Sequence, residues 1–259
     1  MAASQTHRSW TSIGLPMTAL ALMLGAAELA KRAGLLPVFV PGPVEVGTIM
    51  WDNPALVYTN VLPTLYKASA GYAIAAIVAL CAGSIAVLTR QLYNPIYNLG
   101  VGLHSIPIIA TAPLLALSLG NGPQVQIAIA ALASQFPMLV GTMQGLKSAD
   151  ARQRELMHVL SASRWQTLRY LLAPSALPYI LAGLKVAAPS AVLGAVTAEW
   201  AGADRGVGAM MLYALFSYDT PKVWLSVLLT CLLAAGGYGV MALAERLLVW
   251  WDRDVEIES

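Results

Sequence analysis

Long apolar runs alternate with short polar segments along this chain of 259 residues. A helix needs about 20 mostly apolar residues to cross about 30 Å of hydrocarbon. By this measure the pattern predicts about six transmembrane helices, near Ile13–Ala30, Thr64–Leu88, Leu99–Leu119, Gln124–Leu146, Ala176–Ala198 and Val223–Leu247. We therefore expect an all-α, polytopic membrane protein.

The composition agrees with this fold class. Hydrophobic residues make up 58% of the chain, charged residues 11%, and the mean hydropathy is +0.67, whereas ordinary soluble domains carry about 25% charged residues. The first apolar run has an alternative reading as a signal peptide, because Arg8 precedes it. We expect a retained helix instead, since the run is long and Glu28, Lys31 and Arg32 close it without a small-x-small cleavage site.

The chain divides by pattern into residues 1–62 (first helix and outer connection), 63–249 (a core of five spans with a coupling segment at 147–175) and 250–259 (a cytoplasmic tail). In the outer connection three prolines precede VEVGTIMWDN. This favours an extended entry and a short interfacial helix with Trp51 at the headgroup level. An ordered loop with an aromatic anchor explains the same residues.

Positive charges predict the orientation of the helices. Cytoplasmic segments carry more Lys and Arg than outer ones, and with both termini inside, the inner side holds nine and the outer side four. The inner set is Arg8, Arg90, Lys147, Arg152, Arg154, Arg164, Arg169, Arg246 and Arg253, and the outer set is Lys31, Arg32, Arg205 and Lys222. The net charge of +2 follows from this bias, and we expect no nucleic-acid partner.

The polar segment that begins at Glu155 has the pattern of a short helix pair. From Ala151 to Trp165, Leu156, Val159 and Leu160 recur at helical spacing, with Arg152, Glu155, His158 and Arg164 on the other faces. Ser161 and Ser163 favour a turn, after which Trp165, Leu168, Leu171 and Leu172 begin a second helix that we expect Pro174 to close. Such a pair fits a groove in another protein or lies on the lipid surface.

Within the spans, small residues and prolines mark packing and bending. Gly71, Ala75, Ala79 and Gly83 share one helical face, which permits close helix packing. Pro107 and Pro113 predict a kink in the third span, either lining a pathway or simply packed. Cys81 and Cys231 lie in apolar runs, so we expect neither a disulfide nor a metal site.

A few polar residues near the spans are candidates for the solute pathway, because polar groups at membrane depth often serve transport. For His104 a hydrogen bond between helices is the favoured alternative, and for Lys185 we expect snorkelling or pairing with a neighbouring subunit. The pathway candidates are His104, Ser105, Pro107, Glu199, Met210 and Tyr213.

The spacing from Glu155 to Gly183 resembles the EAA loop of bacterial ABC importer permeases. That motif reads E-A-A, three residues, G, then L-P near the start of the next span. Glu155 fits the first position, Ser161 stands at the glycine, and Pro174 ends the L-P pair, followed by Pro178 and Gly183. Leu156 and Met157 replace the two alanines.

Three other stretches are similar to the permeases for taurine, alkanesulfonates, nitrate and related solutes. These are PGPVEV, LHSIPIIATAPLLALSLGNG and AEWAGADRGVGAMM. The resemblance extends in order from Pro41 to the C-terminus. It implies an importer subunit of the bacterial inner membrane that works with two ATP-binding subunits, a second permease copy and an extracytoplasmic binding protein.

The resemblance also implies residue roles. Arg152, Arg154, Glu155, Leu156, His158, Val159, Leu160 and Ser161 would dock the ATPase, and Pro174, Pro178 and Gly183 would carry motion into the fifth span. The chain has no G-x-x-x-x-G-K-[ST] motif. We therefore expect it not to be an enzyme and to bind no cofactor, with ATP and magnesium on the partner. The alternatives are an ion-coupled carrier, which needs ionisable residues near the midplane, and a noncatalytic scaffold.

Overall fold

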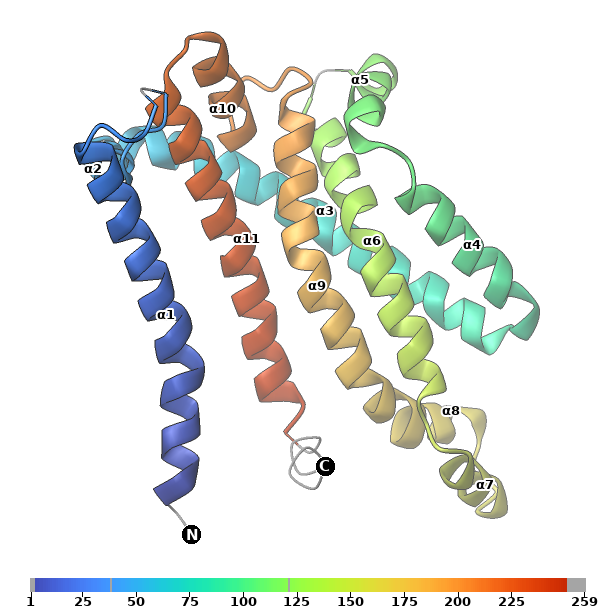
Figure 1. Cartoon of the computed structure of the whole chain (residues 1–259). Helices are drawn as coiled ribbons and strands as arrows, with labels where there is room; N and C mark the ends of the chain where they lie inside the picture. Colours follow the sequence, from blue (N-terminus) through green and yellow to red (C-terminus); the bar gives the residue numbers. More distant parts are fainter. Residues whose placement is uncertain (1–2, 38, 121, 251–259) are drawn as a thin grey trace. The chain divides into compact units, whose positions relative to one another are not determined.

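The computed structural model in Figure 1 describes residues 3–37, 39–120 and 122–250, with the backbone alone at residues 3–13, 16, 90 and 164. The described part is helical and contains no strand. The helices are α1 (Ala3–Arg32), α2 (Pro43–Asp52), α3 (Pro54–Leu88), η1 (Arg90–Leu92), α4 (Tyr93–His104), α5 (Ile108–Leu119), α6 (Pro123–Lys147), α7 (Ala151–Val159), α8 (Arg164–Thr167), the π-helical turn η2 (Leu168–Leu172), α9 (Ala173–Glu199), α10 (Val207–Phe216) and α11 (Thr220–Leu248).

The helical fold class predicted from the sequence is confirmed. Four helical stretches are long and apolar enough to cross a membrane: α3, α6, the continuous helix Trp165–Glu199, and α11. The α4–α5 pair makes a fifth span if it is counted as one. The first predicted span, Ile13–Ala30, lies within the 30 residues of α1. The total of six spans stays a prediction.

The chain forms two units, which are described separately. The smaller consists of the chain up to Tyr58 together with Met210–Val227. In it, the Glu28 carboxylate accepts hydrogen bonds from Arg32 Nε (2.8 Å) and from the Val44 backbone N–H (3.1 Å). Pro43 occupies the first turn of α2, where its missing N–H costs nothing, and Trp51 is 83% exposed. The predicted short helix is confirmed, whereas the position of Trp51 at the headgroup level stays a prediction.

Asp219 orders the start of α11 within the same unit. Its carboxylate accepts the backbone N–H of Lys222 at 3.2 Å and pairs with Lys222 Nζ at 2.6 Å. Hydrogen bonds and charge from Lys222 hold the pKa of Asp219 below its ordinary value. A carboxylate in the first turn of a helix is also favoured by the helix dipole.

The larger unit consists of Thr59–Ala209 and the chain from Leu228 on, and its centre is the α6–α9 pair. Glycines let these two helices approach to backbone contact. A Cβ added at Gly141 would lie 2.6 Å from the Tyr179 carbonyl oxygen, and one at Gly183 would lie 2.6 Å from the Pro137 carbonyl oxygen. No side chain larger than hydrogen fits either place without moving a backbone.

The predicted small-residue face of α3 packs on the same core. Added Cβ atoms would lie 2.6 Å from Ala130 Cβ at Gly71 and 2.8 Å from Thr142 Cγ2 at Gly83. Ala75 and Ala79 are 2% exposed and join Met138 in one apolar cluster. The interpretation of these residues as packing is therefore confirmed.

The third predicted span is broken rather than kinked. α4 and α5 meet at 93° across Ser105–Pro107. Pro107 adopts an extended ψ of 112° just before α5, and proline disfavours a helical conformation in the residue that precedes it. The Ser105 hydroxyl donates to the Val101 carbonyl at 2.8 Å, and the Thr111 hydroxyl to the Pro107 carbonyl at 3.0 Å. Two hydroxyls thus bond to carbonyls on the two sides of the break.

Candidate functional site

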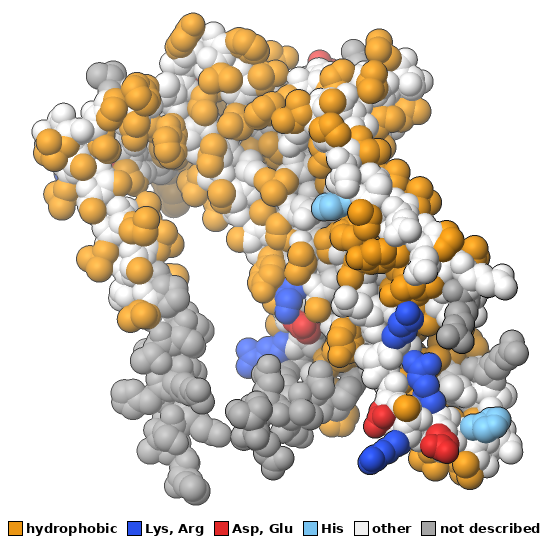
Figure 2. All heavy atoms as spheres, turned by 45° about the vertical axis from the view of Figure 1, so that its right-hand side comes forward, with side chains coloured by type: hydrophobic (Ala, Val, Ile, Leu, Met, Phe, Trp, Pro, Cys, Tyr) orange, Lys and Arg blue, Asp and Glu red, His pale blue; other side chains and the backbone are white. Residues whose placement is uncertain are grey.

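A compact projection, here called the elbow, consists of α7, α8 and the turn between them (Ala151–Thr167). It belongs to the larger unit, and in Figure 1 it lies at the same end of that unit as the end of α11. Figure 2 shows charged side chains gathered toward this end, whereas hydrophobic side chains cover most of the visible face elsewhere.

Polar contacts fix where α7 leaves α6. The Asp150 side chain caps α7 by accepting the backbone N–H of Arg152 at 3.2 Å. Arg154 reaches back toward α6, donating from Nη2 to the Leu146 carbonyl (3.1 Å) and from Nε to the Ala149 carbonyl (3.3 Å). A cation is favoured at these C-terminal carbonyls. Arg154 therefore holds the elbow to α6.

The turn after α7 is a Schellman motif centred on Ser161. The Ala162 N–H bonds the Met157 carbonyl and the Ser161 N–H bonds the His158 carbonyl, both at 2.9 Å. Ser161 has a φ of 50°, the left-handed conformation for which glycine is usual. The position where the resemblance expects glycine thus has the backbone that glycine favours.

The next helix begins with a capping box. The Ser163 hydroxyl accepts the Gln166 N–H at 3.2 Å, and the Gln166 side chain accepts the Ser163 N–H at 2.7 Å. A Schellman motif followed at once by a capping box leaves little freedom between α7 and α8. The elbow is built as a rigid unit.

The outer face of the elbow is apolar and exposed. Leu156, Val159 and Leu160 are 58%, 74% and 65% exposed. At about 100° per residue, Leu156 lies about 160° around α7 from Arg154, so the face that holds the α6 carbonyls is opposite to the apolar one. Arg152, Glu155 and His158 are also exposed, and Trp165, 67% exposed, extends the apolar surface onto α8.

The prediction that Pro174 closes the second helix is wrong. The helix runs from Trp165 to Glu199 without a stop, and the turn before Pro174 widens into η2, where the Ala173 N–H bonds the Leu168 carbonyl five residues back. Proline removes one N–H from the normal ladder. A wider turn shifts the bonding register and lets the helix pass the proline.

The residues assigned to motion coupling lie where the elbow joins the α6–α9 pair. The Ser148 hydroxyl, between α6 and α7, donates to the Ser175 carbonyl at 3.0 Å. Pro178 follows one turn later within α9, and Gly183 makes the backbone contact with Pro137 described above. A continuous helix thus connects the elbow to the tightest packing of the unit.

Lys185 pairs within the chain, which corrects the expectation of snorkelling or of a partner in a neighbouring subunit. Its Nζ bonds the Glu245 carboxylate of α11 and lies 5.9 Å from the Tyr238 ring centroid. The two charged side chains are 21% and 28% exposed. This ion pair ties α11 to α9 on the elbow side of the unit.

A buried polar cluster lies at the opposite end of α9. Glu199, 1% exposed, accepts from Lys67 Nζ (3.0 Å), the Thr64 hydroxyl (2.8 Å) and the Gly208 N–H (2.7 Å). Lys67 also donates to the Arg205 carbonyl at 2.9 Å. The carboxylate thus fastens the loop after α9 to α3. Sequence reasoning missed this pair, although Lys67 and Glu199 were both visible as charges inside or at the end of apolar runs.

Within the larger unit, the structure does not bring the pathway candidates His104, Ser105, Pro107 and Glu199 together. His104 is exposed and stacks on Phe136, with ring centroids 5.0 Å apart and planes at 18°. Ser105 and Pro107 form the break beside it, whereas Glu199 is in the polar cluster. Met210 and Tyr213 belong to the smaller unit. His104 therefore has an aromatic neighbour in place of the expected hydrogen bond between helices.

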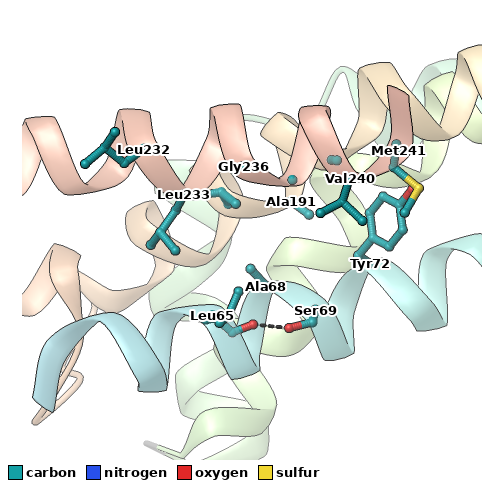
Figure 3. A pocket seen from close by; sticks show the side chains of 13 residues that line it. Leu65, Ala68, Ser69, Tyr72, Ala191, Leu232, Leu233, Gly236, Val240 and Met241 are labelled. Atoms are coloured by element: carbon teal, nitrogen blue, oxygen red, sulfur yellow. Dashed lines mark hydrogen bonds between the residues drawn. The ribbon is translucent and has the colours of Figure 1, made fainter. Parts of the chain in front are cut away.

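An apolar groove of about 330 Å³ lies between α3, α9 and α11 in the larger unit (Figure 3). Its two hydroxyls bond to backbone carbonyls, Tyr72 to Leu184 at 2.9 Å and Ser69 to Leu65. The remaining lining is aliphatic, from residues such as Val192, Leu233 and Val240. The groove offers apolar surface and no free polar group to a solute.

Residues 75–249 match the family described as "Binding-protein-dependent transport system inner membrane component". The chain belongs to this family. It is thus a membrane-spanning permease subunit of ABC importers, which work with ATPase and binding-protein partners, as the EAA-loop resemblance indicated.

Similar members of the family serve several solutes. The chain is 31% identical to the riboflavin transport system permease protein RibX of Chloroflexus aurantiacus, over 94% of this chain and 91% of that one. It is 30% identical to the formylaminopyrimidine transport permease protein ThiX of Halalkalibacterium halodurans (87% and 91%). It is also 30% identical to the putative aliphatic sulfonates transport permease protein SsuC of Bacillus subtilis (74% and 70%), which agrees with the predicted group.

Solved structures of the same fold include the MetNI methionine ABC transporter in an inward-facing conformation. The TM-score is 0.61 at 20% identity, over 78% of this chain and 96% of that one. At this identity the likeness concerns the fold, and it agrees with the all-helical permease architecture described above.

Proposed function

We propose that this permease carries a small anionic or heterocyclic solute into the cytoplasm by alternating access, with the elbow as the docking site of the ATPase. The supporting observation is the exposed apolar face of Leu156, Val159 and Leu160 on a rigid support. Apolar anchors at helical spacing are typical of a helix that fills a groove in a partner. The solute class rests on the relatives named for riboflavin, formylaminopyrimidine and sulfonates.

In this proposal the elbow faces the cytoplasm, together with both chain termini. Lys147, Arg152, Arg154 and Arg169 lie on or beside the elbow, and positive charge favours the cytoplasmic side. The complete importer has two copies of this chain, two ATP-binding subunits and one binding protein on the outer side. ATP and magnesium bind to the partner subunits, because this sequence contains no P-loop, and the chain itself is not an enzyme.

Motion passes from the elbow into the membrane along one continuous helix. When the ATPases close, the elbow moves as a lever, since its two turns are fixed by the Schellman motif and the capping box. The helix Trp165–Glu199 carries this displacement to Gly183 and the α6 contact. This movement is an equilibrium between two conformations of the importer. A ligand shifts that equilibrium only by the difference in its affinity for the two conformations.

A charge placed on the apolar face tests the docking assignment. Leu156→Asp should abolish co-purification with the ATP-binding subunit and solute-stimulated ATP hydrolysis. Ala151→Asp is the matched control, because Ala151 is exposed on the same helix but lies about 140° away from Leu156. Wild-type assembly of the Leu156→Asp variant would contradict the proposal.

A further inference from the structure

We propose that a polar pocket beside the Lys67–Glu199 cluster, here called the outer pocket, binds a solute that presents a hydrogen-bond donor and acceptor on adjacent atoms, such as the edge of an aminopyrimidine. The pocket measures about 320 Å³ and belongs wholly to the larger unit. It lies between α3, the start of α6 and the loop after α9, with Lys67, Gln126, Asp204 and Arg205 among its lining residues. The inference rests on the permease function proposed above and adds a place and a chemistry for its solute.

Gln126 is the residue that points to a ligand. Its side chain lines the pocket and is 5% exposed, yet it makes no hydrogen bond with any residue that the structure describes. The amide atoms of Gln126 are not among the fully buried side-chain atoms that lack a partner in the described part of the chain, so they keep surface toward the pocket. In this position the amide can offer both a donor and an acceptor to a ligand that enters the pocket.

The other lining groups also have bonding capacity to spare. Lys67 has three donor positions, of which one is used by Glu199 and one by the Arg205 carbonyl. Within the described part of the chain, the Asp204 carboxylate and the Arg205 guanidinium take part in no ion pair. The pocket therefore has an amide in its depth and opposite charges at its rim.

Charge balance selects the class of solute. Lys67 forms an ion pair with Glu199, and the lining also contains one carboxylate, Asp204, and one guanidinium, Arg205. Two positive and two negative groups leave no net charge to attract a simple anion. A glutamine amide offers a donor and an acceptor side by side, the pattern that pairs with the donor–acceptor edge of a nitrogen heterocycle. The geometry thus favours a neutral, hydrogen-bonding solute over an inorganic anion.

Direct binding of radiolabelled cytosine to the full chain in lipid nanodiscs tests the inference. Cytosine has an amino donor next to a ring-nitrogen acceptor. We expect saturable binding to the wild type and at least about tenfold weaker binding to Gln126→Met, because the variant loses both bonds of the pair. Gln144→Met is the matched control, since Gln144 is exposed on the same helix, and it should bind cytosine as the wild type does.

Thermal stability separates a solute contact from a structural role. Gln126 has no bond to lose within the described chain, so Gln126→Met should unfold at the same temperature as the wild type or higher. A stable variant that no longer binds cytosine supports the inference. Unchanged affinity in Gln126→Met, or no saturable binding to the wild type, overturns it.

Sulfate competition decides the class of ligand. If sulfate displaces cytosine at lower concentration than unlabelled cytosine does, the pocket is an anion site and the inference is wrong in its chemistry. Loss of cytosine binding leaves the ATPase docking experiment with Leu156→Asp unaffected. A failure here is therefore distinguishable from a failure of the permease proposal.

Discussion

Lys67 Nζ lies 3.0 Å from Glu199 Oε1 across 132 residues of sequence, and both side chains are buried. The pair joins α3 to the end of α9, and the Thr64 hydroxyl and the Gly208 N–H satisfy further lone pairs of the same carboxylate. A buried charge needs this degree of pairing, because desolvation otherwise exceeds the attraction between the ions. The cluster therefore fixes the loop that borders the outer pocket.

Removing one member of this pair should strongly destabilise the permease. Lys67→Met leaves Glu199 as an uncompensated buried charge, for which we expect a loss of about 3–5 kcal/mol of unfolding free energy. The double variant Lys67→Met/Glu199→Gln removes both charges and should recover at least half of that loss. Urea unfolding in mild detergent measures both values, and a double variant as unstable as the sum of the single variants would argue against direct coupling.

Ser161 and Ser163 should respond in opposite directions to substitution. Ser161→Gly relieves a left-handed backbone in a residue with a side chain, and after the extra freedom of glycine in the unfolded chain is subtracted we expect a gain of about 0.5–1 kcal/mol. Ser163→Ala removes the capping hydroxyl and should cost about 1 kcal/mol. Hydrogen exchange at α7 and α8 amides reports these local stabilities. Faster exchange in Ser161→Gly would contradict the assigned turn.

A methyl group at the α6–α9 contact should be tolerated poorly. Gly183→Ala places a Cβ 2.6 Å from the Pro137 carbonyl oxygen, so the helices must separate. Overpacking of this kind typically costs about 1–3 kcal/mol. Gly239→Ala is the matched control, because an added Cβ there meets nothing within 4 Å. Thermal unfolding of the two variants in detergent should show a lower midpoint for Gly183→Ala alone.

Features with a local cause could be predicted from the sequence. Apolar runs of sufficient length predicted the spans, the four-residue repeat from Gly71 to Gly83 predicted the packed face of α3, and Ser161 with Ser163 predicted a turn in the elbow. Each depends on neighbouring residues whose spacing is visible in one sequence. The helix entry at Pro43 is of the same kind.

Features that depend on long-range partners or on the hydrogen-bond register could not be predicted from the sequence. Nothing near Lys67 in sequence indicates Glu199, which is 132 residues away, and Glu245 is 60 residues from Lys185, so neither ion pair could be predicted from the sequence. Pro174 was expected to end a helix because proline usually does, but a π-helical turn absorbs its missing N–H. The vacant bonding capacity of Gln126 is visible only once the surroundings of its side chain are known.

The ion pair between Lys185 and Glu245 should couple α9 to α11 on the elbow side, and exchanging its charges tests this directly. Lys185→Glu sets two carboxylates against each other in a half-buried place, and Glu245→Lys does the same with two ammonium groups. Each single variant should lower the unfolding midpoint and reduce solute-stimulated ATP hydrolysis. The double exchange restores opposite charges and should recover most of both properties, with a coupling energy of about 1 kcal/mol. Recovery should be incomplete because the cation no longer lies near the Tyr238 ring. If the exchanged pair is no better than the worse single variant, Lys185 and Glu245 act separately and α11 is held to α9 by packing alone.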